Sequence, residues 1–224
     1  MPGSSRGRVY AVQVTSDSPR PPDDADETRW ERTRQRILEA AATILSQRGV
    51  AGTSVAAVAQ EADLNAPAIY YYFTSREELI AEVVVSGTVR LRDRLEFALA
   101  QAPAGLGPID LIEIAIAAHL RQLMAESGFA HAVIRNVTQF PPGVREKQQA
   151  EERKYNGVWR GLFKDAEAAG VLREELDVKT AHLLLVGSLN WATEWWTERA
   201  CTLDALVHDA QVMFRHGFIA EAAR

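Results

Sequence analysis

The chain has 224 residues, of which 47% are hydrophobic and 25% are charged, as in an ordinary soluble globular protein of one or two domains. Its formal net charge of −5 excludes a histone-like protein that binds nucleic acid through overall basicity, although it does not exclude a local basic patch. The single cysteine, Cys201, excludes an intramolecular disulfide and a zinc site built on cysteine pairs, and the five histidines are scattered. We therefore predict no metal site and no cofactor.

Hydrophobic runs in this chain are too short for a membrane span of roughly 18 residues. The most apolar stretch, residues 181–196, is interrupted by Gly187, Ser188 and Asn190. The N-terminus lacks the apolar core of a signal peptide. The sequence thus predicts a soluble, cytoplasmic protein with no membrane partner.

Residues 1–28 hold four of the nine prolines and a run of acidic residues, and they show no helical or strand period. This composition predicts a disordered tail. A helical pattern begins at Trp30, and the hydrophobic residues that follow lie on one face of a helix (Ile37, Ala41, Ile44 and Leu45). Gly49 stands where a glycine commonly ends a helix.

Two short helices follow. The pair Thr53-Ser54 is an N-cap signal for a helix over residues 55–62, and Asn65 can cap a third helix over residues 66–72. Asp63 lies in the tight turn between them. This layout predicts a helix-turn-helix at residues 54–73.

The second of these helices has the residue types that DNA recognition requires. Its tip is small, which lets the backbone approach the major groove (Asn65, Ala66, Pro67 and Ala68). Tyr70, Tyr71 and Tyr72 then supply three hydroxyls within one turn, which suit phosphate oxygens.

The charge of the chain is unevenly distributed. Residues 29–94 contain nine arginines and eight acidic residues, whereas both flanking regions are acidic. Arginines also cluster at the start of the first helix (Arg29, Arg32, Arg34 and Arg36), either as a solvated face or as phosphate contacts. The candidate DNA-binding segment is therefore the one part of the chain that is not acidic.

The rest of the chain again has helical patterns, over residues 76–95, 109–126, 129–139, 144–169, 178–196 and 203–218. No run alternates as a strand would, and no internal repeat is present. We predict an all-α fold of about nine helices.

Residues 33–84 resemble the N-terminal domain of TetR-family transcriptional regulators. The resemblance rests on the stretches 37–41 (Ile-Leu-Glu-Ala-Ala), 69–73 (Ile-Tyr-Tyr-Tyr-Phe) and 75–79 (Ser-Arg-Glu-Glu-Leu), together with Gly49, Thr53-Ser54-Val55, Val58-Ala59 and Ala62. It implies a DNA-binding domain at residues 29–75 and a helical ligand-binding and dimerisation domain at residues 76–224. The implied protein is a dimer that binds double-stranded operator DNA, usually as a repressor, and it is not an enzyme.

Three residues depart from the family pattern. Asp63 stands where the family usually has the turn glycine, and Asp tolerates a left-handed φ better than most residues do. Asn65 replaces a serine cap with an equivalent one. Arg76 replaces a lysine and keeps its positive charge.

By position, the resemblance assigns DNA contacts to nine residues. Ser54 would cap its helix and touch a phosphate, and residues 65–68 would face base edges. The DNA backbone would be held by Tyr70, Tyr71 and Arg76, while Tyr72 is as compatible with packing as with contact.

The last two helices are too apolar for a monomer. Residues 178–196 and 203–218 each have hydrophobic side chains beyond those that one core needs, and Gly187 and Ser188 permit close approach of another helix. We predict a homodimer through these two helices, which also suits DNA half-sites about 34 Å apart. A single-chain core without a dimer is the alternative.

The resemblance also implies a small-molecule pocket in the C-terminal domain, whose occupation tilts the helix after residue 76 and changes the spacing of the two recognition helices. Candidate lining residues are polar or aromatic groups in apolar helices (His119, Arg121, His131, Arg135, Trp159, Asn190 and Trp191). Residues 170–196 are more weakly similar to a subgroup that responds to acyl-CoA thioesters and to lipid or steroid catabolites. This implies a mainly apolar effector, such as an acyl-CoA.

Other functions remain open at this point. An efflux regulator would respond to apolar drugs or aromatic compounds, and a helical adaptor would bind no DNA. The sequence has none of the usual catalytic motifs, and Cys201 with His208 is the one pair that resembles a nucleophile and base.

Overall fold

The computed structural model describes residues 24–136 and 138–221, and this part of the chain forms nine α-helices. They are α1 (Asp24–Gly52), α2 (Val55–Glu61), α3 (Ala66–Tyr72), α4 (Arg76–Ala100), α5 (Pro108–Ala125), α6 (Ser127–Asn136), α7 (Pro142–Ala168), α8 (Val178–Trp195) and α9 (Leu203–Phe218). Within the described residues the only β-type pairing is an isolated antiparallel bridge between Leu172 and Ile219. The predicted all-α fold is confirmed.

The first helix is longer than its hydrophobic pattern predicts. It begins at Asp24, so residues 24–28 are helical although they were expected in the tail. Acidic residues favour the N-terminal turn of a helix because they interact with its dipole, which accounts for the extension. Residues 1–23, the remainder of that expected tail, lie outside the described residues.

The helix α1 changes direction at Gly49, as predicted. Gly49 has φ 68°, a left-handed conformation that breaks the helical geometry before the chain enters α2. A Cβ at this position would also lie 3.3 Å from the side-chain oxygen of Asn136, so glycine suits both the turn and the close approach of α6.

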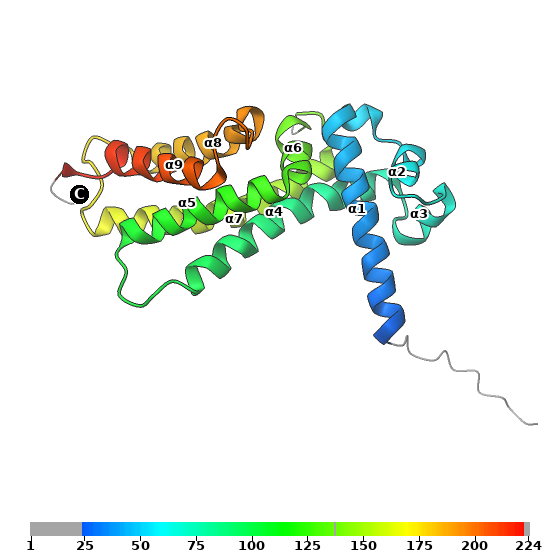
Figure 1. Cartoon of the computed structure of the whole chain (residues 1–224), viewed down its shortest axis with the longest axis horizontal. Coiled ribbons are helices and arrows are strands. Elements are labelled where there is room, and N and C mark those ends of the chain that lie inside the picture. The colour runs from blue at the N-terminus through cyan, green and yellow to red at the C-terminus, as the bar shows by residue number, and fades with distance from the viewer. Residues whose placement is uncertain (1–23, 137, 222–224) are drawn as a thin grey trace, which may run out of the picture.

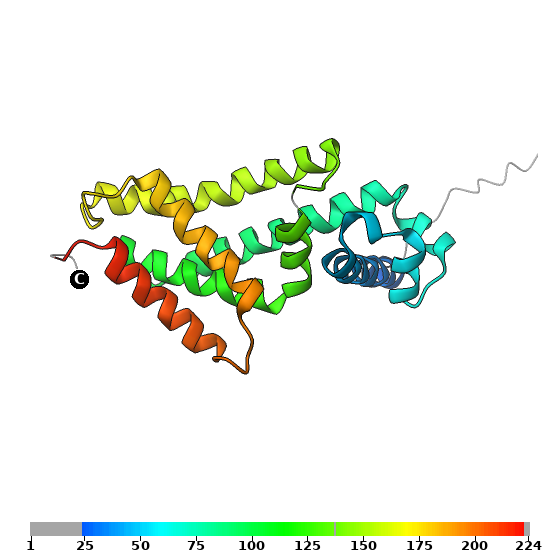
Figure 2. The same cartoon turned by 90° about the horizontal axis from the view of Figure 1, so that it is seen from above.

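The molecule is elongated, with α1, α2 and α3 at one end and α5, α8 and α9 at the other (Figures 1 and 2). Helix α4 connects the two ends and runs alongside α7. An ion pair between Arg92 and Glu151, with a nitrogen–oxygen distance of 2.6 Å, joins these two helices. A movement of α4 relative to α7 would therefore also shift the end of the molecule that holds α1, α2 and α3.

Buried hydrophobic residues form two cores. The first holds α1 to α3 and the start of α4, and the second holds the end of α4 with α5, α7, α8 and α9. Helix α6 and the chain after it contribute to the first core through Phe129, Ala132, Phe140 and Val144. Helix α4 thus contributes to both cores.

Among the described residues, no helix combines the length and the hydrophobicity that crossing a membrane requires.

Candidate nucleic-acid interface and ligand-binding core

The helix-turn-helix is held in shape by local hydrogen bonds. The backbone N–H of Ala57 donates to the hydroxyl of Ser54 at 3.1 Å, and that of Ala68 donates to the side-chain oxygen of Asn65 at 2.9 Å. Asp63 has φ 52°, the left-handed conformation expected of the residue that replaces the turn glycine. Both predicted caps and the predicted turn are confirmed.

The tip of α3 and the tyrosines behind it form an exposed surface at the end of the molecule. Asn65 and Pro67 are exposed, and Ala66 and Ala68 are half-buried. The side chains of Tyr70 and Tyr71 are 55% and 75% exposed, while Ile69 between the tip and the tyrosines is buried in the first core. Two adjacent aromatic side chains exposed on a helix are typical of a binding surface.

Tyr72 lies differently from its two neighbours. Its ring centroid is 5.6 Å from that of Trp30 on α1 and 5.2 Å from that of Tyr71. The ring therefore packs between α1 and α3, which matches the packing alternative left open by the sequence.

Arg76 has an intramolecular role that the sequence did not indicate. Its guanidinium donates hydrogen bonds to the backbone carbonyls of Val50 and Thr53, which lie where α1 ends and α2 begins. The carbonyl of Val50 also accepts from the backbone N–H of Thr53 at 3.3 Å, and the guanidinium adds a second donor at this end of α1. Arg76 thus fixes the entry of the chain into the helix-turn-helix.

We expect Arg76→Lys to lower the free energy of unfolding by about 1–2 kcal/mol. Lysine keeps the charge that a phosphate contact needs, but its single nitrogen cannot reach both carbonyls as the two nitrogens of the planar guanidinium do. Urea denaturation measures this loss, with Arg153→Lys on α7 as the matched control. Unchanged stability with weakened operator binding would instead identify Arg76 as a direct phosphate contact.

The arginines of α1 divide into two groups. Arg34 forms an ion pair with Glu82 at 2.9 Å and lies over the rings of Trp30 and Phe73, so it belongs to the packing of the domain. The side chains of Arg29, Arg32 and Arg36 are exposed on the same helix.

A cluster of polar side chains is buried in the second core. His119 on α5 and Trp159 on α7 are both completely buried, and Nδ1 of His119 is hydrogen-bonded to the hydroxyl of Tyr155. The amide of Asn190 on α8 lies near the imidazole, and the hydroxyl of Tyr155 lies near the indole of Trp159. Within the described residues, however, Nε2 of His119 and Nε1 of Trp159 have no hydrogen bond of acceptable geometry. Buried polar atoms without partners are rare in native proteins, and they are candidates for ligand contacts.

The electrostatics of this cluster follow from its burial. Burial lowers the pKa of His119 to about 4, with Asn190 opposing the shift, and it raises the pKa of Tyr155. Both groups are therefore neutral at pH 7. The cluster offers neutral hydrogen bonds to a ligand and no charge.

The other predicted ligand residues do not join this cluster. Arg121 is exposed and forms an ion pair with Asp204 on α9 at 2.8 Å, and Trp191 is 61% exposed. Both side chains point away from the core because the helical register places them on its outer side. The side chains of His131 and Arg135 on α6 lie outside the described residues.

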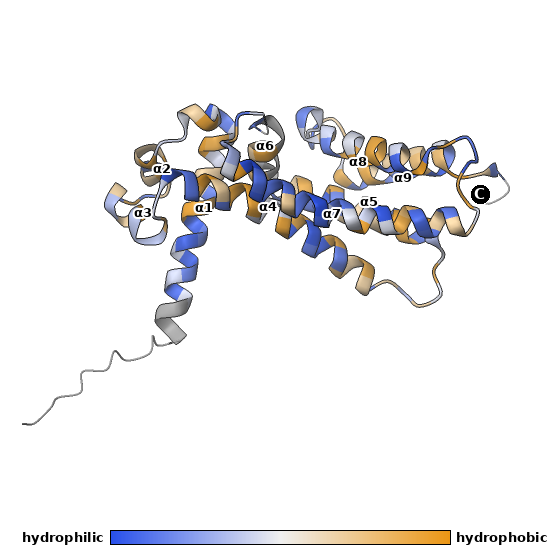
Figure 3. Cartoon of the chain, turned by 180° about the vertical axis from the view of Figure 1, so that it is seen from behind, coloured by the Kyte–Doolittle hydropathy of each residue, from blue (hydrophilic) through white to orange (hydrophobic). Residues whose placement is uncertain are grey.

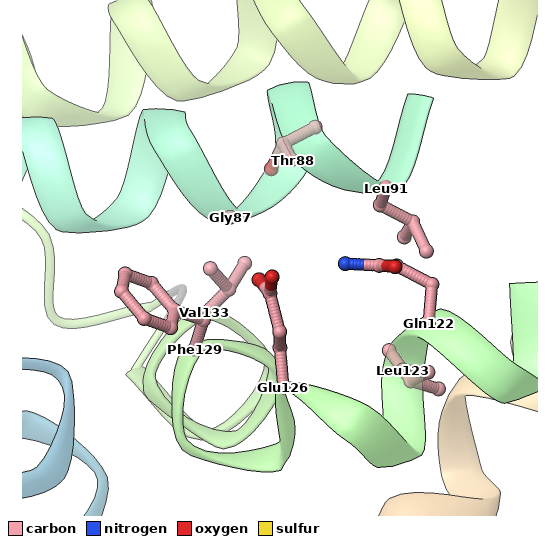
Figure 4. A pocket seen from close by; sticks show the side chains of 8 residues that line it. All are labelled: Gly87, Thr88, Leu91, Gln122, Leu123, Glu126, Phe129 and Val133. Atoms are coloured by element: carbon pink, nitrogen blue, oxygen red, sulfur yellow. The ribbon is translucent and has the colours of Figure 1, made fainter. Parts of the chain in front are cut away.

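A small cavity lies between α4, α5 and α6 (Figure 4). Gln122 and Glu126 extend toward α4 from one side of it, and the hydrophobic side chains of Leu91, Phe129 and Val133 complete much of the lining. Its volume is about 60 Å³, whereas pockets for organic ligands typically measure roughly 300–1,000 Å³. An effector of that size would have to separate these helices.

Gln122 and Glu126 are not among the ligand contacts that the sequence predicts. The available signal was Gly87, a glycine inside an otherwise apolar helix face. A Cβ at Gly87 would lie 3.3 Å from Cβ of Phe129, so this glycine lets α6 approach α4 beside the cavity.

Large hydrophobic side chains lie exposed on α8 and α9. Hydrophobic residues dominate α8 in Figure 3, and six large hydrophobic side chains of the two helices are at least 40% exposed (Leu183, Leu184, Trp191, Trp195, Val212 and Met213). Gly187 and Ser188 lie exposed on the same helix as the first four. An exposed apolar surface of this kind is typical of protein–protein interfaces.

Known proteins share both halves of this architecture. Residues 37–83 match the family model of bacterial regulatory proteins of the tetR family, and residues 105–208 match a model of tetracyclin repressor-like C-terminal domains. An HTH-type transcriptional repressor of Streptomyces coelicolor is 30% identical over 165 residues, which cover 72% of this chain and 79% of that protein. The chain belongs to the TetR family of bacterial regulatory proteins.

Two further relatives carry names that concern metabolism. The fatty acid metabolism regulator protein of Bacillus subtilis is 20% identical over 161 residues, which cover 72% of this chain and 81% of that protein. The structure of the ketosteroid transcriptional regulator KstR2 of Mycobacterium tuberculosis has the same fold, with a TM-score of 0.73 and 17% identity over 84% of this chain and 95% of that chain.

Membership of the TetR family confirms the sequence-based prediction of a DNA-binding transcriptional repressor. TetR-family regulators bind operator DNA as dimers, and they are not enzymes. The alternatives of an enzyme and of an adaptor without DNA binding are thereby set aside.

Proposed function

We propose that this TetR-family repressor reads its operator through residues 65–68 of α3 and is released by a mainly apolar effector, such as an acyl-CoA or a lipid or steroid catabolite. The observation that carries the DNA-binding part is the exposure of Tyr70 and Tyr71 directly behind the capped tip of α3. Asn65 and the small side chains after it face base edges, and Ser54, Tyr70 and Tyr71 hold phosphates.

We expect the double variant Tyr70→Phe/Tyr71→Phe to bind operator DNA at least about tenfold more weakly, because each protomer loses two hydroxyl donors to phosphate. Fluorescence anisotropy with the DNA upstream of the protein's own gene measures this change. Tyr72→Phe is the matched control, because the Tyr72 ring packs against Trp30. Its hydroxyl is assigned no phosphate contact, so we expect the loss of this hydroxyl to leave operator affinity unchanged. Equal affinity of the double variant and the native protein would refute the assignment.

The effector part of the proposal is supported by the buried cluster in the second core. His119, Tyr155, Trp159 and Asn190 place neutral polar atoms among hydrophobic side chains. In the described part of the chain, two of these atoms lack a hydrogen bond of good geometry. An apolar molecule with one polar group suits such a site. The names of the fatty acid and ketosteroid regulators point to the same chemical class.

A path for the effector's signal is provided by contacts of α4 and α6 with α1. Arg90 on α4 forms an ion pair with Glu126 at 2.8 Å, lies 4.0 Å from the ring centroid of Phe129 and donates to Gln35 on α1. The buried side chain of Asn136, at the end of α6, donates to the carbonyl of Leu45 on α1 at 3.2 Å. An effector that separates α4 from α6 would disturb these contacts, and it acts only if it binds the disturbed state more tightly.

The effector class is tested by thermal shift and by release of labelled operator. A series of acyl-CoA thioesters, free fatty acids and steroid acids is compared with hydrophobic cations. We expect members of the first group to stabilise the protein against unfolding and to release the labelled operator. At a free ligand concentration of about 100 times the Kd, the free energy of unfolding should rise by about 2.7 kcal/mol. A response to the cations alone would replace this proposal with an efflux regulator.

A further inference from the structure

A second pocket lies at the surface between the C-terminal half of α7 and the start of α8, and nothing in the proposed function uses it. Its volume is about 270 Å³. The apolar part of its lining is Phe163, which is completely buried, and Val178. Its other side chains are predominantly basic (Arg160, Lys164, Lys179 and His182, with Glu167 as the one carboxylate).

The three cations of this pocket have unfavourable electrostatic neighbours, which the carboxylate of Asp177 offsets in part for Lys179. Arg160 and Lys164 are four residues apart on α7, a spacing at which like charges repel. Lys179 is in the first turn of α8, where the helix dipole opposes a positive charge. Within the described residues, none of the three forms an ion pair, although the domain as a whole is acidic. A bound anion would remove all of these unfavourable interactions.

A buried polar atom at the same pocket supports this interpretation. His182 is only 2% exposed, and its Nδ1 makes no hydrogen bond of acceptable geometry in the described part of the chain. Its ring lies 6.1 Å from that of Phe163, centroid to centroid, so it stands beside the apolar wall. Burial lowers the pKa of His182 and the charge of Arg160 adds to this shift, while the backbone carbonyls of Val178 and Lys179 beside the ring oppose it. A neutral imidazole at this position can turn its one N–H from these carbonyls to a ligand.

We propose that this pocket binds an organic phosphate monoester, with the phosphate between Arg160, Lys164 and Lys179 and the apolar part against Phe163 and Val178. Three cations match a dianion better than they match a single carboxylate, and the hydrogen of a neutral His182 meets a phosphate oxygen. Because α7 also packs along α4, an occupant here would contact a helix that reaches toward the DNA-binding end.

The proposal is tested on the full-length protein in a phosphate-free buffer by isothermal titration calorimetry with inorganic phosphate, hexyl phosphate and hexanoate. We expect hexyl phosphate to bind most tightly, with a Kd below about 1 mM, and hexanoate at least about fivefold more weakly. Equal binding of hexanoate would overturn the phosphate assignment, and no binding of any probe would overturn the site.

Variants locate the binding on the molecule. We expect Arg160→Ala/Lys179→Ala to raise the Kd for hexyl phosphate at least about tenfold, because two of the three positive charges that face the phosphate are lost. Arg153→Ala/Lys147→Ala, which removes two exposed cations from the first half of α7, is the matched control and should leave the Kd unchanged. Equal weakening in both double variants would show general charge attraction and refute the pocket.

The side chain of His182 gives an independent readout. Its imidazole resonances should shift on addition of hexyl phosphate, and His182→Phe should weaken the binding while the circular dichroism spectrum stays native. Operator affinity in the absence of the probe should not change in Arg160→Ala/Lys179→Ala. A failure of phosphate binding with intact operator binding would refute this site alone and leave the proposed repressor function standing.

Discussion

A Leu184→Glu variant is expected to be monomeric at micromolar concentration and to bind operator DNA at least about 100-fold more weakly than the native protein. Leu184 is 65% exposed on α8, in the apolar surface that we assign to the dimer. A buried carboxylate in each copy would face an apolar partner without a counter-charge, which is costly. A monomer then reaches one half-site only. Size-exclusion chromatography with light scattering measures the first effect, and anisotropy measures the second.

Phe97→Glu is the matched control for this variant. Phe97 on α4 is also a large exposed hydrophobic residue, at 55%, but it lies outside α8 and α9. The control should remain dimeric and bind operator normally. A dimeric Leu184→Glu protein would show that another surface mediates dimerisation.

The second large effect is a loss of stability in acid that originates at His119. Its pKa is lowered by burial from 6.5 to about 4, so the unfolded chain takes up a proton on this residue below pH 6.5 while the folded protein does not. The contribution of neutral His119 to the free energy of unfolding is therefore fully present above pH 6.5, and it is lost as the pH falls toward 4. Integrated over this window, the free energy of unfolding falls by about 3 kcal/mol on account of this residue.

The contribution of His119 is isolated by difference. Urea denaturation at pH 7, 5.5 and 4 is compared between the native protein and His119→Gln, which keeps a polar group near Tyr155 but does not titrate. Between pH 7 and pH 4, we expect the free energy of unfolding of His119→Gln to fall by about 3 kcal/mol less than that of the native protein. His208→Gln, at an exposed position on α9, should retain the native pH dependence. Identical slopes for the native protein and His119→Gln would contradict the buried, neutral imidazole.

The cluster around His119 was only partly visible in the sequence. The sequence predicts His119, Trp159 and Asn190 as ligand contacts, because they are polar or aromatic residues in apolar helices. It does not predict Tyr155. Tyr155 lies four residues before Trp159, at the end of a half-helix that looks polar and exposed, and only the packing of α7 against α5 shows that it is buried. The same limit applies to Arg121, whose exposure and pairing with Asp204 depend on how α5 and α9 meet.

Local sequence patterns account for the helices and for the form of the helix-turn-helix. The caps at Ser54 and Asn65, the left-handed turn at Asp63 and the break at Gly49 are local features, because each depends on hydrogen bonds or backbone angles within about four residues.

The roles of isolated polar residues depend on how the helices pack. Arg76 carried the charge of a phosphate contact, yet it binds carbonyl groups 23 and 26 residues earlier in the chain. The basic pocket of α7 and α8 likewise unites residues on two helices that no local pattern relates. A helical sequence specifies which residues share a face, whereas the partner of that face is set by how the helices pack, and so by the chain as a whole.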